Sequence, residues 1–313
     1  MDIIEARKAF HRSKTVYDSA LLRFHGAEGF DVYNCSIPFE WKGKQYIFGR
    51  VERREDFANS VSLLFERVGK DEYAAVPGSM MYPLEDPYVA VISGELIMGG
   101  THVRKRQGEV DAFYGYFYRG GRPEWMTHFT SGPMNMKDIR LVQLADGQVG
   151  VFSRPRGPHV EEVYGSGAVI GFAVMDSIDE LNAQVIENAP VIPDLFGRGE
   201  WGGCNQCYLL KDGRVGVVGH RSYKATDADG IEQLVYLNIA FIFDPAAHSA
   251  CDMKIIGDKL CYPATGAMRE DLRDCAFTSG ILMRPDGKAD LYSGLGDVTE
   301  GRITIDPPFG DLL

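Results

Sequence analysis

Polar and charged residues recur at the ends of strand-like segments throughout this chain of 313 residues. Taken singly, such groups are most often solvated surface side chains, and an aspartate before a proline is most often a turn residue. Their recurrence at similar places in successive segments favours a shared pocket instead. The residues concerned are Asn34, Arg50, Glu85, Asp86, Lys137, Asp138, Arg154, Arg156, His220 and Asp297.

Brought together, these residues would place carboxylates, several cations and one imidazole in a common pocket. The chain has a formal net charge of −11, so an anionic ligand would need a local positive pocket of this kind. The same acidity disfavours nucleic acid and anionic membrane surfaces, because both repel a negatively charged protein. We therefore expect neither nucleic acid nor a membrane as a partner.

The elements that must position these groups are short β-rich hairpins. Each consists of a strand, a tight turn that contains glycine, and a second strand. Three of the turns carry an Asp-Gly dipeptide, a pair that tolerates the positive φ angles of hairpin turns. The hairpins cover residues 39–48, 88–97, 139–152, 207–218 and 280–292.

The spacing of the hairpins, about 50 to 75 residues, is that of propeller blades with insertions. The sequence therefore predicts an all-β chain that forms a five-bladed β-propeller, with residues 1–313 as a single domain and about residues 1–25 as an N-terminal extension. The innermost strands of a propeller line one channel, so their polar residues would converge there. A two-sheet sandwich is the alternative fold, but it gives no reason for five similar hairpins.

Helical periodicity is confined to residues 4–13 and 177–186. The loop at residues 192–204 is rich in Pro and Gly, and we interpret it as a functional loop rather than a domain boundary. No apolar run reaches membrane-spanning length, and the charged N-terminus does not resemble a signal peptide. We therefore expect a cytoplasmic protein.

Six cysteines are spread along the chain, and in a cytosolic protein of this size they are expected to be free and buried. Cys204 and Cys207 have the CxxC spacing that can begin a zinc site. A second pair with similar spacing is missing from the sequence. We therefore expect no bound metal.

The segment Tyr82-Pro-Leu-Glu-Asp-Pro-Tyr88 resembles the Glu-Asp-Pro-Arg motif of glycoside hydrolase family 130, the inverting β-mannoside phosphorylases. Other segments are similar to motifs of that family and occur in the same order, from about residue 30 to residue 305. Their common order makes the set more specific than any single match. The segments are Val32-Tyr-Asn34, Phe48-Gly-Arg50, Lys137-Asp138, Ser153-Arg-Pro155, Trp201 through Gly219-His220, and Leu291-Tyr-Ser-Gly-Leu-Gly-Asp297.

Three departures from the motifs indicate a diverged relative. Tyr88 stands where the family has arginine, Cys35 where it has proline, and Ser153 where it has histidine. The chain looks more like glycosyltransferase family 108, formerly a domain of unknown function. That resemblance implies a five-bladed propeller that transfers mannose to and from β-1,2-linked mannose oligosaccharides. Its donor would be mannose 1-phosphate, with GDP-mannose as a further donor.

The resemblance implies a role for each group, with Asp86 as the general acid. Its proton would reach the leaving oxygen through the 3-hydroxyl of the sugar. Inorganic phosphate would attack the other face of the sugar as a co-substrate, and no cofactor or metal would be required. The residues expected to bind phosphate are Arg154, His220, Lys137, Arg156 and Tyr223, and those expected to bind mannose are Asn34, Arg50, Glu85, Asp138 and Asp297.

Two other functions stay open at this point. A plain glycoside hydrolase on the same fold would need a second carboxylate that activates water, and it would have no use for the phosphate-binding cations. A non-catalytic propeller that binds other proteins is the second alternative, since a fold alone does not fix a function. That alternative predicts a funnel without converging charges and a large exposed apolar patch.

Overall fold

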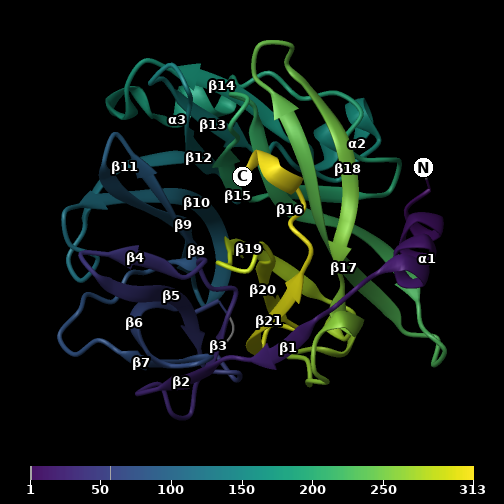
Figure 1. Cartoon of the computed structure of the whole chain (residues 1–313), viewed down its shortest axis with the longest axis horizontal. Helices are drawn as coiled ribbons and strands as arrows, with labels where there is room; N and C mark the ends of the chain where they lie inside the picture. Colours follow the sequence, from purple (N-terminus) through teal and green to yellow (C-terminus); the bar gives the residue numbers. More distant parts are fainter. Residues whose placement is uncertain (1, 57) are drawn as a thin grey trace.

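The computed structural model describes residues 2–56 and 58–313, and β-strands dominate it. Strands account for 51% of the residues and helices for 11%, which confirms the β class expected from the sequence. Within the described residues, the strands form four sheets, and the largest has ten strands. A parallel bridge between Val32 and Thr299 joins two antiparallel parts of that sheet. Counted separately, these two parts and the other three sheets make five groups of strands that follow one another along the chain. In Figure 1 the groups lie in order around the molecule.

The first three groups occupy the N-terminal half of the chain. Their strands are β3 (Asp31–Tyr33), β4 (Phe39–Trp41), β5 (Lys44–Glu52), β6 (Val61–Gly69), β7 (Glu72–Ala75); β8 (Glu85–Ile92), β9 (Glu95–Arg106), β10 (Glu109–Gly120), β11 (Thr127–Met134); and β12 (Arg140–Gln143), β13 (Val149–Ser153), β14 (Gly171–Met175). The first group pairs in the order β3-β5-β6-β7, with β4 added to β5. The second and third pair in chain order.

The last two groups also pair in chain order. Their strands are β15 (Trp201–Leu209), β16 (Val215–Thr226), β17 (Glu232–Asp244), β18 (Ser249–Gly257); and β19 (Ala276–Met283), β20 (Ala289–Leu295), β21 (Thr299–Ile305). The N-terminal strand β1 (Asp18–Leu21) pairs antiparallel with β21, and β2 (Arg23–His25) pairs parallel with β7. The N-terminal segment therefore adds to the junction between the last group and the first, where β21 and β3 also pair in parallel.

All five predicted hairpins are present in the structure. In the turns with Asp-Gly, only the glycine has a positive φ, of 89° at Gly147 for example. The preceding aspartate stabilises the turn with its side chain: Asp146 Oδ1 accepts a hydrogen bond from the Gln148 N–H at 3.0 Å. This is the geometry of a type I turn followed by a left-handed glycine.

Helix α1 (Ile3–Ser13) confirms the first predicted helix, and the side chain of Asp2 caps its N-terminus. The second predicted helix, residues 177–186, is wrong as one element. It is divided into η1 (Ile178–Glu180) and α3 (Ala183–Glu187), because Asn182 is extended and caps a new helix. Helix α2 (Pro158–Tyr164) was not predicted, because it buries no residue and therefore has no apolar periodicity. The remaining short helices are η2 (Lys259–Cys261), η3 (Glu270–Leu272) and η4 (Gly310–Leu312).

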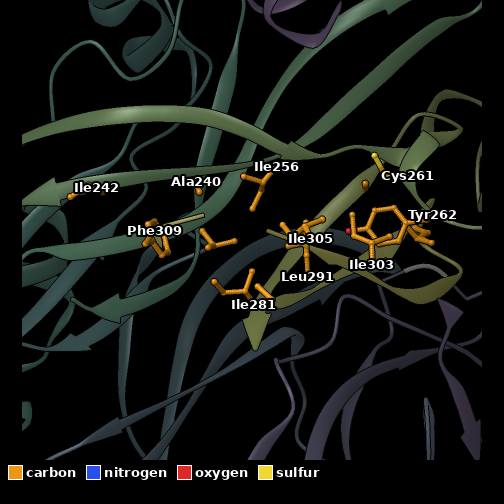
Figure 2. Close-up of a cluster of buried hydrophobic side chains, with 14 of the residues drawn as sticks. Ala240, Ile242, Ile256, Cys261, Tyr262, Ile281, Leu291, Ile303, Ile305 and Phe309 are labelled. Atoms are coloured by element: carbon orange, nitrogen blue, oxygen red, sulfur yellow. The ribbon is translucent and has the colours of Figure 1, made fainter. Parts of the chain in front are cut away.

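Buried apolar side chains gather between neighbouring groups of strands. Figure 2 shows the cluster between the fourth and fifth groups, where Ala240 and Ile256 face Leu291 and Ile303. Similar clusters lie between the first and second, second and third, and third and fourth groups. A further cluster includes Tyr292 of the fifth group among side chains of the first. Each group therefore packs on the next, and the last packs on the first.

No helix in the described part of the chain is long and apolar enough to cross a membrane. The cysteines are free, and five are buried, but Cys251 is exposed on β18. The expectation that every thiol is buried is therefore wrong for Cys251, whose strand lies at the outer edge of its sheet.

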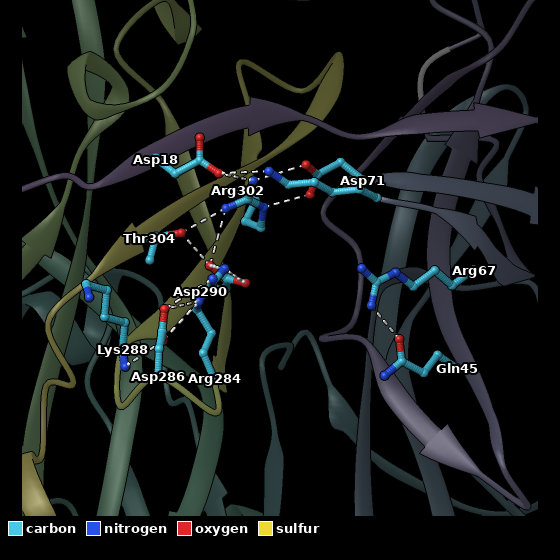
Figure 3. Close-up of polar contacts among 11 residues, drawn as sticks. Asp18, Gln45, Arg67, Asp71, Arg284, Asp286, Lys288, Asp290, Arg302 and Thr304 are labelled. Atoms are coloured by element: carbon cyan, nitrogen blue, oxygen red, sulfur yellow. Dashed lines mark hydrogen bonds and ion pairs between the residues drawn. The ribbon is translucent and has the colours of Figure 1, made fainter.

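Arg302 ties the fifth group to the first and to the N-terminal strand. Its buried guanidinium donates two hydrogen bonds to Asp71, at 2.7 and 3.0 Å, and one to Asp18 at 2.9 Å. Asp71 lies in the turn between β6 and β7, and Asp18 lies in β1. Figure 3 shows this network between the two groups, with Asp290 on its other side. Since the partners come from distant parts of the sequence, the network holds the two ends of the fold together.

We expect Arg302→Met to lower the free energy of unfolding by about 3 kcal/mol, because it leaves the buried Asp290 and the half-buried Asp71 without their cation. Equilibrium urea unfolding, followed by fluorescence and circular dichroism, measures this loss. Lys224→Met is the control. Lys224 forms an ion pair with Glu232 in which both side chains are exposed, so its loss should cost less than about 1 kcal/mol. Equal losses in both variants would show that the network does not hold the groups together.

Candidate active site

Four of the predicted site residues share a left-handed backbone at the ends of strands. Their φ angles are 45° at Asn34, 50° at Asp86, 59° at Asp138 and 57° at Asp297. Asparagine and aspartate tolerate this region better than other residues with side chains. Such strain costs about 1–3 kcal/mol for each residue and persists where the surroundings impose it. The residues therefore mark points at which four groups of strands turn in a similar way.

Arg50 lies at the centre of a buried carboxylate cluster, by which we mean Glu52, Glu85, Asp86 and Asp297. Its guanidinium forms ion pairs with Glu52 at 2.7 Å, Glu85 at 3.0 Å and Asp86 at 3.1 Å. It also lies over the Tyr33 ring, 4.8 Å from the ring centroid. Arg50 thereby fixes β8 of the second group against β5 of the first.

Asn34 connects Asp86 to Asp297. Its Nδ2 group donates to Asp86 Oδ1 at 2.9 Å and to Asp297 Oδ1 at 3.4 Å. Burial raises the pKa of Asp297, and the nearby Asp86 charge raises it further, although Arg50 opposes the shift. Burial likewise raises the pKa of Glu85. The carboxylate cluster carries more negative charge than Arg50 neutralises, so it retains a proton readily. A retained proton suits general-acid chemistry.

A second cluster, which we call the cationic cluster, contains Lys137, Asp138, Arg154, Arg156 and His220. Arg154 forms an ion pair with Asp138 at 3.1 Å, and its Nε–H donates to the Gly202 carbonyl at 2.6 Å. Burial alone would raise the pKa of Asp138, but Arg154 and Lys137 hold it well below its usual range. Asp138 is therefore a charged partner that orients Arg154, rather than a proton donor.

Arg154 and His220 lie side by side over the backbone of Gly203 in β15. A Cβ atom at Gly203 would lie 2.9 Å from Arg154 Cδ and 2.9 Å from His220 Cε1. Real Cβ contacts are not this short, so only glycine allows both side chains to approach the strand. Burial and the neighbouring Arg154 charge lower the pKa of His220 to about 3. The imidazole is therefore neutral at physiological pH.

Lys137 of the cationic cluster also acts electrostatically on the carboxylate cluster. Its charge lowers the pKa of Glu85 and Asp297 on one side, and of Asp138 and His220 on the other. Arg156 is more exposed, and its guanidinium lies 5.4 Å from the Phe113 ring centroid. Within the described residues, neither Lys137 nor Arg156 forms an ion pair. Both cations are therefore available to an anionic ligand.

Tyr223 lies apart from the cationic cluster, contrary to the role expected for it. It is three residues beyond His220 in β16, and successive side chains of a strand point to opposite faces. Tyr223 packs against Ile3 of α1, and its hydroxyl accepts a hydrogen bond from Arg7 at 3.4 Å. The expectation that Tyr223 binds phosphate is therefore corrected: it helps to dock the N-terminal helix.

Several residues of the site were missed in the sequence. Glu52 lies two residues after Arg50 and therefore on the same face of β5. The alternation of side chains along a strand could have predicted this position. Asn205 is in a bulge between Cys204 and Gln206, where the strand pairing shifts, and no local signal marks it. Tyr236 lies in an apolar strand, 5.6 Å from the His220 ring centroid, and also lacks a signal.

Cys204 and Cys207 are buried in β15. In residues 2–56 and 58–313, no group of three or more histidine, cysteine, aspartate or glutamate side chains has a geometry that could hold a metal ion.

Glu300 supports the Asn34 turn from inside the fold. Its carboxylate accepts hydrogen bonds from the Cys35 N–H at 3.1 Å and from the Ser279 hydroxyl at 2.7 Å. Burial raises the pKa of Glu300 to about 8. The native state therefore binds this proton up to a higher pH than the unfolded state does. Stability is lost as the pH rises from about 4.5 to about 8.

We expect Glu300→Gln to gain stability relative to the wild type as the pH rises, because glutamine cannot lose the proton. The difference in Tm, variant minus wild type, should be larger by at least about 3 °C at about pH 9 than at about pH 5. Thermal unfolding at both pH values measures it, with the exposed Glu40→Gln as control. A difference in Tm that does not change with pH would contradict the raised pKa of Glu300.

The two clusters together can bind an anion beside a buried acid. The cationic cluster offers charged N–H donors from Arg154, Arg156 and Lys137, which suit a tetrahedral oxyanion. The carboxylate cluster offers protonatable groups and hydrogen-bond acceptors that suit sugar hydroxyls. The charge of Lys137 acts on groups of both clusters, which indicates that the clusters are neighbours.

Comparisons with known proteins identify relatives over nearly the whole chain. A family model described as "Protein of unknown function (DUF1861)" matches residues 8–311. A search of curated proteins found no match. Among solved structures, MPT-4, a mannose phosphorylase from Leishmania mexicana in complex with a phosphate ion, is 53% identical, with a TM-score of 0.93. The match covers 98% of this chain and 93% of that one.

Two further structures are similar to this chain, one at high and one at low sequence identity. MPT-1, a GDP-Man-dependent mannosyltransferase from Leishmania mexicana, is 45% identical over 100% of this chain and 98% of its own, with a TM-score of 0.91. A β-1,2-mannobiose phosphorylase from Listeria innocua is 12% identical over 89% of this chain and 91% of its own, with a TM-score of 0.63. The second likeness shows a shared fold alone.

Proposed function

This chain belongs to the DUF1861 family, and we propose that it is an inverting phosphorylase and mannosyltransferase acting on β-1,2-linked mannose oligosaccharides. The observation that carries the proposal is the buried cationic cluster of Arg154 and His220 beside the carboxylate cluster around Arg50. The relatives described above as a mannose phosphorylase and a mannosyltransferase support mannose as the transferred sugar. Mannose 1-phosphate is the proposed donor, with GDP-mannose as a further donor.

We also propose that the five groups of strands are the blades of a five-bladed propeller. The apolar clusters between successive groups, including the last and the first, support a closed ring. The shared fold with the mannobiose phosphorylase is consistent with it. The single domain and the cytoplasmic location stay predictions.

In the proposed reaction, phosphate binds to Arg154, Arg156 and Lys137, and the mannoside binds beside Asn34 and Asp297. A phosphate oxygen forms a bond to the anomeric carbon while the bond from that carbon to the glycosidic oxygen breaks. Asp86 supplies the proton that the leaving oxygen needs, since an unprotonated sugar oxygen is a poor leaving group. A second carboxylate that activates water is unnecessary, because phosphate is already the nucleophile.

The activity can be tested directly by incubating the protein with mannose 1-phosphate and a mannose acceptor. The proposal predicts longer oligosaccharides and one free phosphate for each mannose transferred. Supplying oligosaccharide and phosphate should give mannose 1-phosphate in the reverse direction. Release of free mannose without any need for phosphate would instead identify a hydrolase.

Asp86→Asn is expected to lower kcat by about 10²–10⁴-fold, because the amide keeps the shape but cannot donate the proton. By microscopic reversibility the loss should appear in both phosphorolysis and synthesis. The two rates are measured after circular dichroism has shown that the variant is folded. Asp146→Asn, in the turn between β12 and β13, is the control. Near-normal turnover of Asp86→Asn would rule out this residue as the acid.

Arg154→Ala is expected to act mainly on binding, raising the KM for phosphate by roughly tenfold or more, since a charged hydrogen bond contributes about 1.5–3 kcal/mol. Because Ala leaves the buried Asp138 without its partner, Arg154→Lys is the second variant, which keeps the charge but not the paired N–H groups. Initial rates at varied phosphate measure KM and kcat separately. An unchanged KM in both variants would place the phosphate elsewhere.

A further inference from the structure

The imidazole of His220 is fully buried. One of its ring nitrogens has a hydrogen-bond partner among the described residues, and the other has none. Its Nδ1 lies 2.7 Å from the side-chain oxygen Oδ1 of Asn205. Its Nε2 is buried and, among the described residues, has no hydrogen-bond partner. Buried polar atoms without a partner are costly in proteins, and they occur where a ligand supplies the missing hydrogen bond.

The contact with Asn205 decides which ring nitrogen carries the proton. An amide oxygen can only accept a hydrogen bond, so Nδ1 of His220 must donate. The imidazole is neutral, as described above, and a neutral imidazole has a single N–H group. Nε2 is therefore left as a hydrogen-bond acceptor.

Asn205 is itself held in position by the surrounding structure. It occupies the bulge of β15, and its backbone carbonyl accepts a hydrogen bond from Arg140 Nε at 2.6 Å. The Arg140 guanidinium in turn lies over the Tyr88 ring, 4.4 Å from the ring centroid. These contacts hold the backbone of Asn205 in the bulge independently of His220.

The surroundings of His220 are positively charged. Arg154, Lys137 and Arg140 act on it, with Asp138 as the opposing charge, and the Tyr236 and Phe277 rings pack against it at 5.6 and 5.0 Å. These cations attract an anion, but a lone pair on Nε2 repels an anion's oxygen. The repulsion becomes a hydrogen bond only if that oxygen carries a hydrogen atom.

We propose that His220, positioned by Asn205, accepts a hydrogen bond from the P–OH group of phosphate and so selects protonated phosphate over tetrahedral anions without a proton. The inference rests on the proposed function, since it concerns the same phosphate site. Asn205 is a positioning residue that acts through His220. The proton stays on a phosphate oxygen that does not react, so the transfer itself is unchanged.

The proposal distinguishes ligands by whether their phosphate or sulfate group carries a proton. Inorganic phosphate carries at least one proton at neutral pH, whereas sulfate has the same shape and none. The diphosphate of a nucleotide sugar has no proton either, so His220 favours inorganic phosphate over GDP-mannose. A phosphate monoester has a second pKa of about 6. Mannose 1-phosphate therefore carries the required proton mainly below that pH, and synthesis should favour lower pH than phosphorolysis does.

The first test is the tautomer of His220 in the folded protein, read from its nitrogen-15 chemical shifts by NMR. The spectrum of His220→Gln identifies the signal among those of the seven histidines. We expect a protonated Nδ1 and an unprotonated Nε2. A protonated Nε2 would overturn the proposal, because that nitrogen would then donate to any oxyanion.

The second test is calorimetric binding of phosphate and sulfate at neutral pH and equal ionic strength. We expect phosphate to bind at least about tenfold more tightly, because sulfate leaves the buried acceptor unpaired. Asn205→Ala frees the tautomer and should bring the ratio of the two affinities close to one. The control is the same substitution at an exposed position, Asn188→Ala at the C-terminal end of α3. It should keep the wild-type ratio.

The outcomes separate this inference from the proposed function. Equal binding of phosphate and sulfate by the wild type, or an unchanged ratio in Asn205→Ala, would overturn the inference even if phosphorolysis proceeds. Selective phosphate binding without any transfer of mannose would support the inference and refute the proposed function. Failure of both anions to bind would overturn both.

Discussion

The buried ion pairs of Arg50 are the interaction on which the geometry of the site depends. One guanidinium holds carboxylates from β5 and β8, and Asn34 extends the contacts to Asp297 after β20. Three groups of strands therefore meet through polar contacts in the buried interior. Because a buried charge that loses its partner is strongly destabilising, these contacts allow little displacement of the groups. The apolar clusters between the groups supply stability, whereas the ion pairs set positions.

The parts of the structure that local sequence determines could be predicted. The five hairpins follow from alternating strands and glycine turns, and helix α1 follows from its cap and its periodicity. The site residues with left-handed backbones could be found because Asn34, Asp86, Asp138 and Asp297 belong to the few residue types that accept such angles. The helix expected at residues 177–186 failed because Asn182 could either continue a helix or cap a new one, and local pattern does not decide between them.

The rest of the site depends on contacts between distant strands. Asn205 meets His220 only because the pairing of β15 with β16 shifts by one residue at the bulge. A shift of this kind follows from the packing of the whole sheet and is not encoded in the few residues around it. Tyr223 illustrates the opposite case, since alternation along β16 already placed it on the face away from His220. The family resemblance implied the same role for both residues, whereas the geometry of a single strand separates them.

The site also explains how a chain with a net charge of −11 can attract an anion. Surface charges act through water and are screened within about 10 Å, whereas buried charges in contact act through a medium of lower dielectric constant. Asp138 keeps its negative charge and offsets part of the charge of Arg154, but Lys137 and Arg156 have no such partner in the described residues. The cationic cluster is therefore positive although the protein as a whole is negative. Charge alone would admit any small oxyanion. The neutral His220 adds a second requirement, which is that the anion carry a proton.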